Sequence, residues 1–272
     1  KWDGSMWLLQ SSAPNSSEDV INLIPSDGVC ITSNIPIAVG GTFKTLNVAE
    51  NSELDLGANT INILGGIENN GVINAGSGTI TMNSEGDQTV SGSGSTSFSN
   101  LSLNKPSGNL ILASDIVVKG DLDLSSNILN PNNIITVGTS SANPGDISNN
   151  GGVVIGKLRR FFENNSGSKF FPIGIQGTMR DVSVDFINAP GSDQYLTISY
   201  NTGYPQLEGS DLYAGLPLTI GDQLIQNYDD EGYWEIIPGS LLLGDDYNAS
   251  INDENYNISI HCNELTNEGG SN

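Results

Sequence analysis

The chain has 272 residues, of which 36% are hydrophobic, so it can bury the core of one large domain or two ordinary domains. Its 9 lysines and arginines stand against 31 aspartates and glutamates, which gives a formal net charge of −22. So acidic a chain repels nucleic acid and anionic membrane surfaces, and it has no apolar run of the roughly 18 residues that a transmembrane helix requires. We therefore expect neither nucleic-acid binding nor direct membrane insertion.

Residues 1–36 are expected to form an N-terminal cap on a coiled β structure. Trp2 and Trp7 lie close together in this segment, which also contains an apolar strand at 19–24. The first coil of a solenoid exposes an apolar end, and large aromatic side chains in a terminal segment can cover it. A cap is therefore the role that we predict for this segment.

Residues 37–150 are predicted to form a right-handed β-helix. Short triplets such as 46–48 and 122–124 alternate apolar and polar residues, so each strand buries one face and exposes the other. Glycine, asparagine and serine separate the triplets, as in 92–94, which is typical of tight corners. At about 20 residues per turn, the coil would complete about five turns before Gly138. The alternation places Leu54, Leu56, Leu101, Leu103, Leu122 and Leu124 in one core and points Asp55, Ser102 and Asp123 outward.

Residues 151–266 are predicted to form a β-sandwich. After a loop at 139–152 that is rich in Ser, Asn, Pro and Gly, the expected strands become longer and more aromatic, and the loops between them lengthen. The final residues, 267–272, have the composition of a linker and indicate that the parent chain continues. The predicted strands are 153–162, 181–187, 195–200, 233–237 and 257–261.

Several motifs, in a fixed order along nearly the whole chain, carry a family resemblance. They are Trp-Asp-Gly-Ser at 2–5 with Trp7, the strand ending in proline at 17–25, Gly-Ile-Glu-Asn-Asn-Gly at 66–71, Gly-Thr-Ile-Thr-Met at 78–82, Gly-Asp-Gln-Thr-Val-Ser-Gly at 86–92, Phe-Ser-Asn-Leu at 98–101, Phe-Phe-Pro-Ile-Gly at 170–174 and Gly-Tyr-Trp-Glu-Ile at 232–236. Together they resemble a surface-protein module that is common in Bacteroidota.

This resemblance implies a large, secreted, adhesin-like protein of the cell surface, exported by the type IX secretion system and associated with the outer membrane and gliding motility. It also implies an extracellular location, with other cell-surface or secretion-system proteins and glycans as partners. The C-terminal sorting domain of such proteins is not recognisable in this chain, which fits an excised piece of a longer protein.

The sequence offers little for nucleophilic or zinc chemistry. The single histidine, His261, precedes Cys262 in a predicted strand, so the two side chains should point to opposite faces. One histidine and two cysteines are also too few ligands for the usual zinc sites. We therefore predict that the chain is not an enzyme and has no catalytic residues.

Carboxylate pairs leave sugar chemistry as the alternative enzyme class. Glu53 with Asp55, and Asp121 with Asp123, lie at i and i+2 on the outer face of predicted strands, and Lys119 is the base nearest to the second pair. Most charges on a strand's outer face serve solubility, so a solvated face is the default interpretation, ahead of a cation site or catalysis.

Two acidic loops in the second half supply the candidate metal ligands. Hard cations take carboxylate and carbonyl oxygens, and these loops combine acids with nearby glycine and tyrosine, although neither matches the EF-hand loop. Calcium is therefore the candidate cofactor. The residues are Asp229, Asp230, Glu231, Asp245 and Asp246.

Two residue pairs leave alternatives open. Arg159 and Arg160 either bind an acidic partner or pack over aromatic rings and pair with nearby carboxylates, which is the default in so acidic a protein. Cys30 and Cys262 are either two thiols or one disulfide that staples the cap to the end of the sandwich, and their spacing does not decide between these states.

These observations predict a non-enzymatic, extracellular structural or adhesive module of a larger secreted protein of the cell surface. A stiff solenoid holds a binding tip away from the membrane and offers a long outer surface. The alternative is a polysaccharide-binding or polysaccharide-degrading protein on the same β-helix scaffold.

Overall fold

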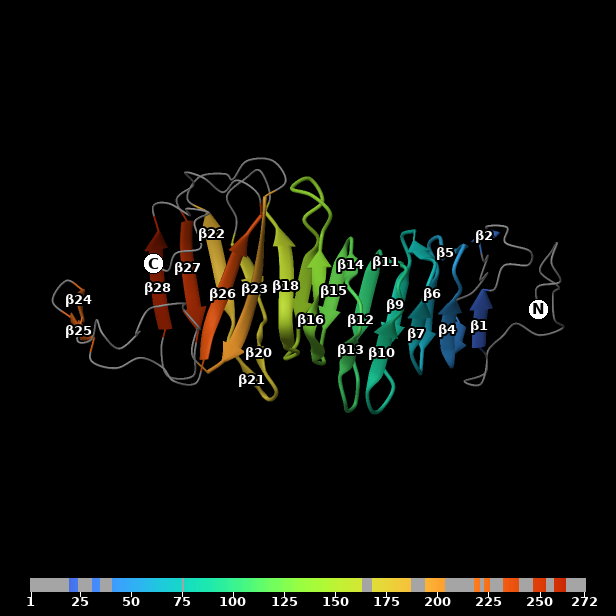
Figure 1. Cartoon of the computed structure of the whole chain (residues 1–272), viewed down its shortest axis with the longest axis horizontal. Coiled ribbons are helices and arrows are strands. Elements are labelled where there is room, and N and C mark those ends of the chain that lie inside the picture. Colours follow the sequence, from blue (N-terminus) through green and yellow to red (C-terminus); the bar gives the residue numbers. More distant parts are fainter. Residues whose placement is uncertain are drawn as a thin grey trace.

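In the computed structural model the chain forms a long coil of short strands that continues into antiparallel sheets (Figure 1). The structure describes residues 20–23, 31–34, 41–74, 76–162, 168–186, 194–203, 218–220, 223–225, 232–239, 247–252 and 257–262. Within these residues every regular element is a β-strand, which confirms the predicted all-β class.

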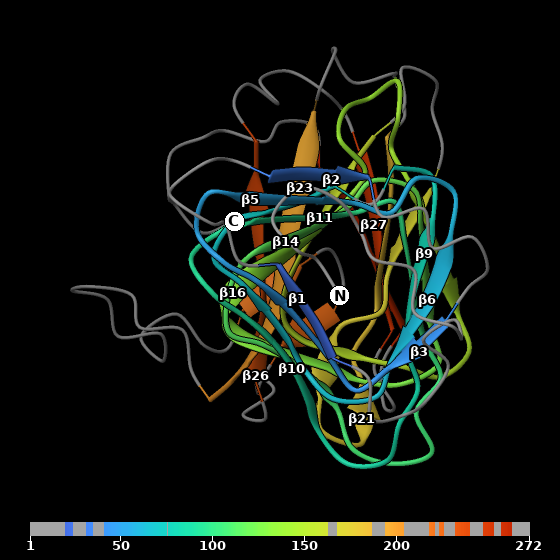
Figure 2. The same ribbon diagram turned by 90° about the vertical axis from the view of Figure 1, so that its right-hand side faces the viewer.

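Each turn of the coil contains three strands, and each strand pairs in parallel with its equivalent one turn later. The three resulting faces surround the core when the coil is viewed from its N-terminal end (Figure 2). One of the three faces is a separate sheet of six strands, one from each turn, so the coil has six turns.

The strands divide among the faces in chain order. Face one contains β1 (Val20–Leu23), β4 (Thr45–Val48), β7 (Ile67–Asn69), β10 (Gln88–Ser91), β13 (Leu110–Leu112) and the start of β16 (Ile128–Val137). Face two contains β2 (Ile31–Asn34), β5 (Ser52–Asp55), β8 (Val72–Asn74), β11 (Ser95–Phe98), β14 (Ile116–Val118) and the end of β16. Face three contains β3 (Gly41–Phe43), β6 (Thr60–Ile63), β9 (Thr79–Met82), β12 (Asn100–Leu103), β15 (Asp121–Leu124) and β17 (Asp146–Asn149).

The inward side chains of the three faces form one hydrophobic core. The six leucines that alternation placed inside are each at most 1% exposed, as predicted: Leu54, Leu56, Leu101, Leu103, Leu122 and Leu124. Ser102 and Asp123, between inward neighbours, are partly exposed, which confirms their outward direction. The side chain of Asp55 lies outside the described residues.

The length of a turn is close to the expected 20 residues. Leu46 pairs with Ile67, and Val90 pairs with Leu112, so these turns take 21 and 22 residues. Strands β1 and β2 fall within the segment 1–36, and they pair in parallel with β4 and β5 as the first turn of the coil. Trp2 and Trp7, on which the cap prediction depends, lie outside the described residues, so the cap stays a prediction.

Glycine is required where corners of successive turns touch. Gly92 has a positive φ of 111°, and a Cβ at this position would lie 2.0 Å from the backbone oxygen of Asn69. A Cβ on Gly94 would lie 2.1 Å from the backbone oxygen of Gly71. Real Cβ atoms do not approach a carbonyl so closely, so these contacts support the interpretation of 92–94 as a corner.

Beyond the coil, the pairing changes from parallel to antiparallel at one strand. β18 (Val154–Phe161) continues the coil by parallel pairing with β16, and its other edge pairs antiparallel with β23 (Tyr195–Thr202), which pairs with β26 (Gly232–Pro238). A second antiparallel sheet contains β19 (Lys169–Phe171), β22 (Val182–Phe186), β27 (Tyr247–Asn252) and β28 (Asn257–Cys262). Two hairpins complete the elements, β20 (Gly174–Ile175) with β21 (Thr178–Met179) and β24 (Leu218–Ile220) with β25 (Gln223–Ile225).

The five strands predicted for this half all exist, with ends that differ by at most two residues. Phe162, Phe171, Val182 and Leu196 belong to the same core cluster as the leucines of the coil. The hydrophobic core is therefore continuous from the coil into the antiparallel part.

Candidate functional site

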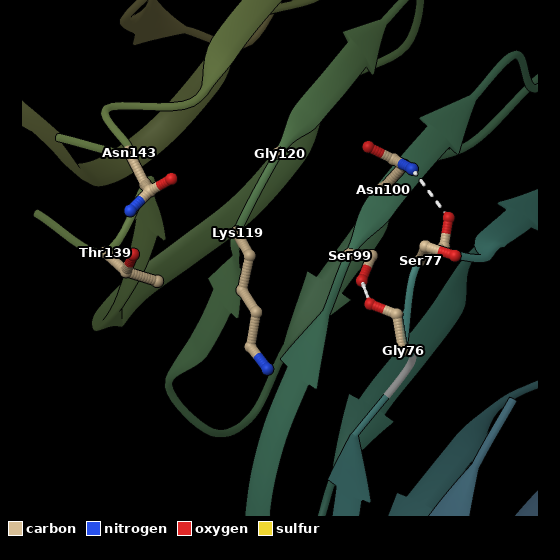
Figure 3. Close-up of a pocket in the computed structure, with 8 residues that line it drawn as sticks. All are labelled: Gly76, Ser77, Ser99, Asn100, Lys119, Gly120, Thr139 and Asn143. Carbon is tan, nitrogen blue, oxygen red and sulfur yellow. Dashed lines mark hydrogen bonds between the residues drawn. The ribbon is translucent and has the colours of Figure 1, made fainter. Parts of the chain in front are cut away.

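One corner of the coil, between faces two and three, carries a shallow groove lined by glycine and by polar residue types. Four consecutive turns contribute to it, each through residues at the corner between a face-two strand and the next face-three strand. The cavity has a volume of about 380 Å³ and is open to solvent (Figure 3). We call it the corner groove, and its lining residues are Gly76, Ser77, Ser99, Asn100, Lys119, Gly120, Thr139 and Asn143.

Asn100 fixes the spacing of three turns in this groove. Its Nδ2 donates to the backbone oxygens of Ser77 and Gly78 in the preceding turn, both at 3.4 Å, and its Oδ1 accepts from the backbone N–H of Asp121 in the following turn, at 2.9 Å. The hydroxyl of Ser99 donates to the backbone oxygen of Gly76. The walls are therefore held by short side chains whose hydrogen bonds run between turns.

Lys119 is the basic side chain of the corner groove. In Figure 3 it extends between Thr139 and Asn143 on one side and Ser99 and Gly76 on the other. Its Nζ donates at 2.8 Å to Oδ1 of Asn74, which lies two turns earlier. Within the described residues no carboxylate lies within 4.0 Å of this ammonium group.

The carboxylate pair at Asp121 and Asp123 projects from face three, as the alternation predicted. Asp123 accepts hydrogen bonds from the hydroxyl of Ser102 at 3.1 Å, the hydroxyl of Ser125 at 3.3 Å and the side-chain amide of Asn150 at 3.3 Å. These donors belong to three successive turns. Asp123 therefore acts as a connector between turns, whereas Asp121 is exposed.

The surroundings of the pair do not match an acid–base arrangement. Lys119, the nearest base in the sequence, is hydrogen-bonded to Asn74 and makes no ion pair with Asp121 or Asp123. The side chain of Asp55 in the other candidate pair lies outside the described residues, and its partner Glu53 is partly exposed on face two.

Short polar side chains form a regular column on face three. Each member lies opposite its neighbour in the adjacent strand, so the column follows the coil axis. Neighbouring strands are about 4.8 Å apart, which sets the repeat of the column. Its members are Thr42, Asn62, Thr81, Ser102, Asp123 and Ser148.

A buried polar cluster that the sequence did not reveal links three turns inside the coil. Lys105 is only 8% exposed, and its Nζ donates to the backbone oxygen of Ser84 at 2.9 Å and to Oε1 of Gln88 at 2.6 Å. Nε2 of Gln88 donates to the backbone oxygens of Ile63 and Gly65, at 2.7 and 2.8 Å. Desolvation lowers the pKa of Lys105, and the negative charge of nearby Asp87 partly opposes this change.

Arg159 and Arg160 confirm the default interpretation of this pair, because both contact other residues of the chain. The guanidinium of Arg159 lies 4.5 Å from the ring centroid of Tyr195. Arg160 is 2% exposed, donates to the backbone oxygen of Phe170 at 2.8 Å and pairs with Asp146 at 3.4 Å. The two side chains therefore join β18 to the antiparallel part and to face three.

Several predicted site residues cannot be placed. The calcium candidates Asp229, Asp230, Glu231, Asp245 and Asp246 lie outside the described residues, as does Cys30. Cys262 is the last residue of β28, but its side chain is not described. Among the described side chains, no group of three or more His, Cys, Asp or Glu residues is suited to hold a metal ion. No helix in the described part is long and apolar enough to span a membrane.

Comparison with known proteins adds no relative. No family model matches the chain, and no match was found among curated proteins or solved structures. The resemblance to Bacteroidota surface modules therefore depends on the motifs alone.

Proposed function

We propose that the chain is a non-enzymatic, extracellular spacer and adhesive module of a larger secreted protein of the cell surface. In this proposal a right-handed β-helix with an N-terminal cap passes into a β-sandwich, and the type IX secretion system exports the parent protein. The observation that carries the proposal is the single core that extends through the coil into the antiparallel sheets.

A continuous core supports a mechanical role for a physical reason. Each turn of a solenoid contacts only its neighbours, so its stiffness depends on how firmly successive turns are joined. Here the turns are joined by backbone pairing on three faces and by corner and internal side chains such as Asn100, Asp123 and Gln88. Bending the coil would break several of these contacts at once, so it is suited to hold a partner at a fixed distance from the cell.

The surroundings of the candidate acids support a non-enzymatic role. Asp123 accepts hydrogen bonds from neighbouring turns, and Lys119 makes no ion pair with Asp121 or Asp123. A polysaccharide lyase or hydrolase would need these groups arranged around a bound sugar.

Two experiments test the proposal. Brief protease treatment of intact cells of the source organism should release peptides of this chain while a cytoplasmic marker stays intact. Protection of the chain until the cells are lysed would contradict the extracellular assignment.

The second experiment incubates the purified chain with pectin, alginate and similar polymers, with and without calcium. We expect no turnover above that of a heat-denatured control. Turnover that Asp121→Ala or Asp123→Ala abolishes would instead establish the polysaccharide-degrading alternative.

A further inference from the structure

The corner groove holds a lysine, Lys119, that makes no ion pair with the described carboxylates. The chain has 31 acidic residues, yet within the described part none lies within 4.0 Å of the Lys119 ammonium group. An ammonium group can donate three hydrogen bonds, and the described residues accept one of them, through Asn74. Lys119 therefore retains donors and charge for a ligand in the groove.

The rest of the lining can bind the hydroxyl groups of a sugar. The side chains of Thr139 and Asn143 are exposed on the groove wall, and neither makes a hydrogen bond through its side-chain hydroxyl or amide within the described part. Both groups donate and accept hydrogen bonds, as sugar hydroxyls do. The eight lining residues include no aromatic ring, so recognition here depends on charge and hydrogen bonds rather than on stacking.

The shape of the groove favours an extended chain over a compact molecule. Its residues come from four consecutive turns, and at about 4.8 Å per turn these span roughly 14 Å along the coil axis. The volume of about 380 Å³ lies near the lower end of the range for ligand sites, about 300 to 1,000 Å³.

We infer that the corner groove binds an acidic polysaccharide, with Lys119 pairing with a carboxylate or sulfate group and Thr139 and Asn143 contacting sugar hydroxyls. This inference deepens the proposed function, on which it rests for its extracellular setting, by naming the class of polymer to which the module adheres. Because the coil continues past the groove in both directions, several units of one polymer chain can lie along the corner.

The test measures binding of three polymers to the full chain at about 0.15 M salt, where repulsion from the net charge is screened beyond about 8 Å. Polygalacturonate carries carboxylates, its methyl-esterified form has the same backbone without the charge, and carrageenan carries sulfate groups. We expect one or both charged polymers to bind, and the methyl ester to bind at least about tenfold more weakly. Comparison of the affinities for polygalacturonate and carrageenan shows whether the groove prefers a carboxylate or a sulfate group.

Three variants assign the binding to the groove. Lys119→Gln should weaken binding about tenfold, and Lys119→Arg should retain most of it. Lys157→Gln on β18, which removes the same charge outside the groove, should leave binding unchanged. Thermal melting of each variant checks that the fold persists, as expected for substitutions that bury no new group.

Three results would overturn the inference: no binding of either charged polymer, equal binding of the methyl ester, or equal losses in Lys119→Gln and Lys157→Gln. Each of these can occur in a protein that is extracellular and non-enzymatic, so failure of the inference is distinguishable from failure of the proposed function. Cleavage of a bound polymer would contradict the non-enzymatic proposal and leave the groove assignment intact.

Discussion

Truncation of Leu122 to alanine should be one of the most destabilising single changes in the coil. Leu122 is fully buried, and it lies in register with Leu101 in the preceding turn and Ile147 in the following turn. Large-to-alanine substitutions in protein cores cost about 2 to 5 kcal/mol, depending on how far the surroundings collapse into the space. Backbone pairing on both sides of β15 resists such collapse, so we expect a loss of about 3 to 5 kcal/mol.

Urea denaturation followed by far-ultraviolet circular dichroism measures this loss, with Asp121→Ala as the matched control in the same strand. Asp121 is exposed, so its truncation should change the free energy of unfolding by about 0.5 kcal/mol or less. Leu122→Asp should be more severe than Leu122→Ala, because it buries a carboxylate without a partner. A one-residue shift in register would exchange the buried and exposed positions. Asp121→Ala costing as much as Leu122→Ala would therefore refute the assigned register.

Three further predictions concern a corner, the buried lysine and calcium. Gly92→Ala should destabilise the chain by about 1 to 3 kcal/mol in the same denaturation assay, because the added Cβ meets a backbone oxygen at a positive φ; an unchanged midpoint would contradict the corner geometry. Lys105→Met should cost about 1 to 3 kcal/mol at neutral pH, because Gln88 loses its buried donor. The pKa of Lys105 is lower in the folded chain, so the unfolded chain binds the proton more tightly. The wild type should therefore gain stability relative to Lys105→Met as the pH rises toward about 10. A stability difference between the two proteins that stays constant with pH would contradict this reasoning. If the loops at 229–231 or 245–246 bind calcium, excess chelator should lower the melting temperature relative to millimolar calcium, and no shift would remove the calcium hypothesis.

The sequence was sufficient to predict the strands and their buried faces, because both depend on local alternation. In the segment that contains Leu122 and Asp123, each side chain takes the face that its polarity predicts. Five strands of the second half were also predictable, since their aromatic and β-branched runs are bounded by turn residues, whereas strands such as β27 were not predicted. Alternation does not show where the coil begins. Strands β1 and β2 lie in the segment expected to form a cap, but they pair with the next turn and so belong to the coil.

The corner groove and the buried cluster were not predictable because they join residues of different turns, 45 positions apart for Lys119 and Asn74 and 17 for Lys105 and Gln88. Lys119 and Asn74 meet across two turns, and Lys105 meets Gln88 across one, so both contacts depend on the register of stacked turns. Lysine is also among the residues least often buried, which makes Lys105 an unexpected core residue from its sequence alone. Its burial is explained by Gln88 one turn earlier, which accepts a hydrogen bond from the Lys105 ammonium group and itself donates to the backbone of the turn before.

A further prediction concerns the two cysteines. β2 begins at the residue after Cys30, β28 ends with Cys262, and the two strands lie at opposite ends of the molecule (Figure 1). We therefore expect mass spectrometry of the unreduced protein to find two free thiols, whereas a mass that shows one disulfide would require the ends to meet.

A distance measured along face three tests the stiff coil most directly. Thr42 and Ser148 occupy the first and last positions of the polar column, five strand spacings apart, so their Cα atoms should be separated by roughly 24 Å. Spin labels at Thr42→Cys and Ser148→Cys, with Cys30 and Cys262 replaced by serine, allow this distance to be measured by pulsed electron paramagnetic resonance. A single narrow distribution consistent with that separation is the predicted result. A broad distribution, or one centred far from this value, would contradict a rigid parallel coil and the spacer function that depends on it.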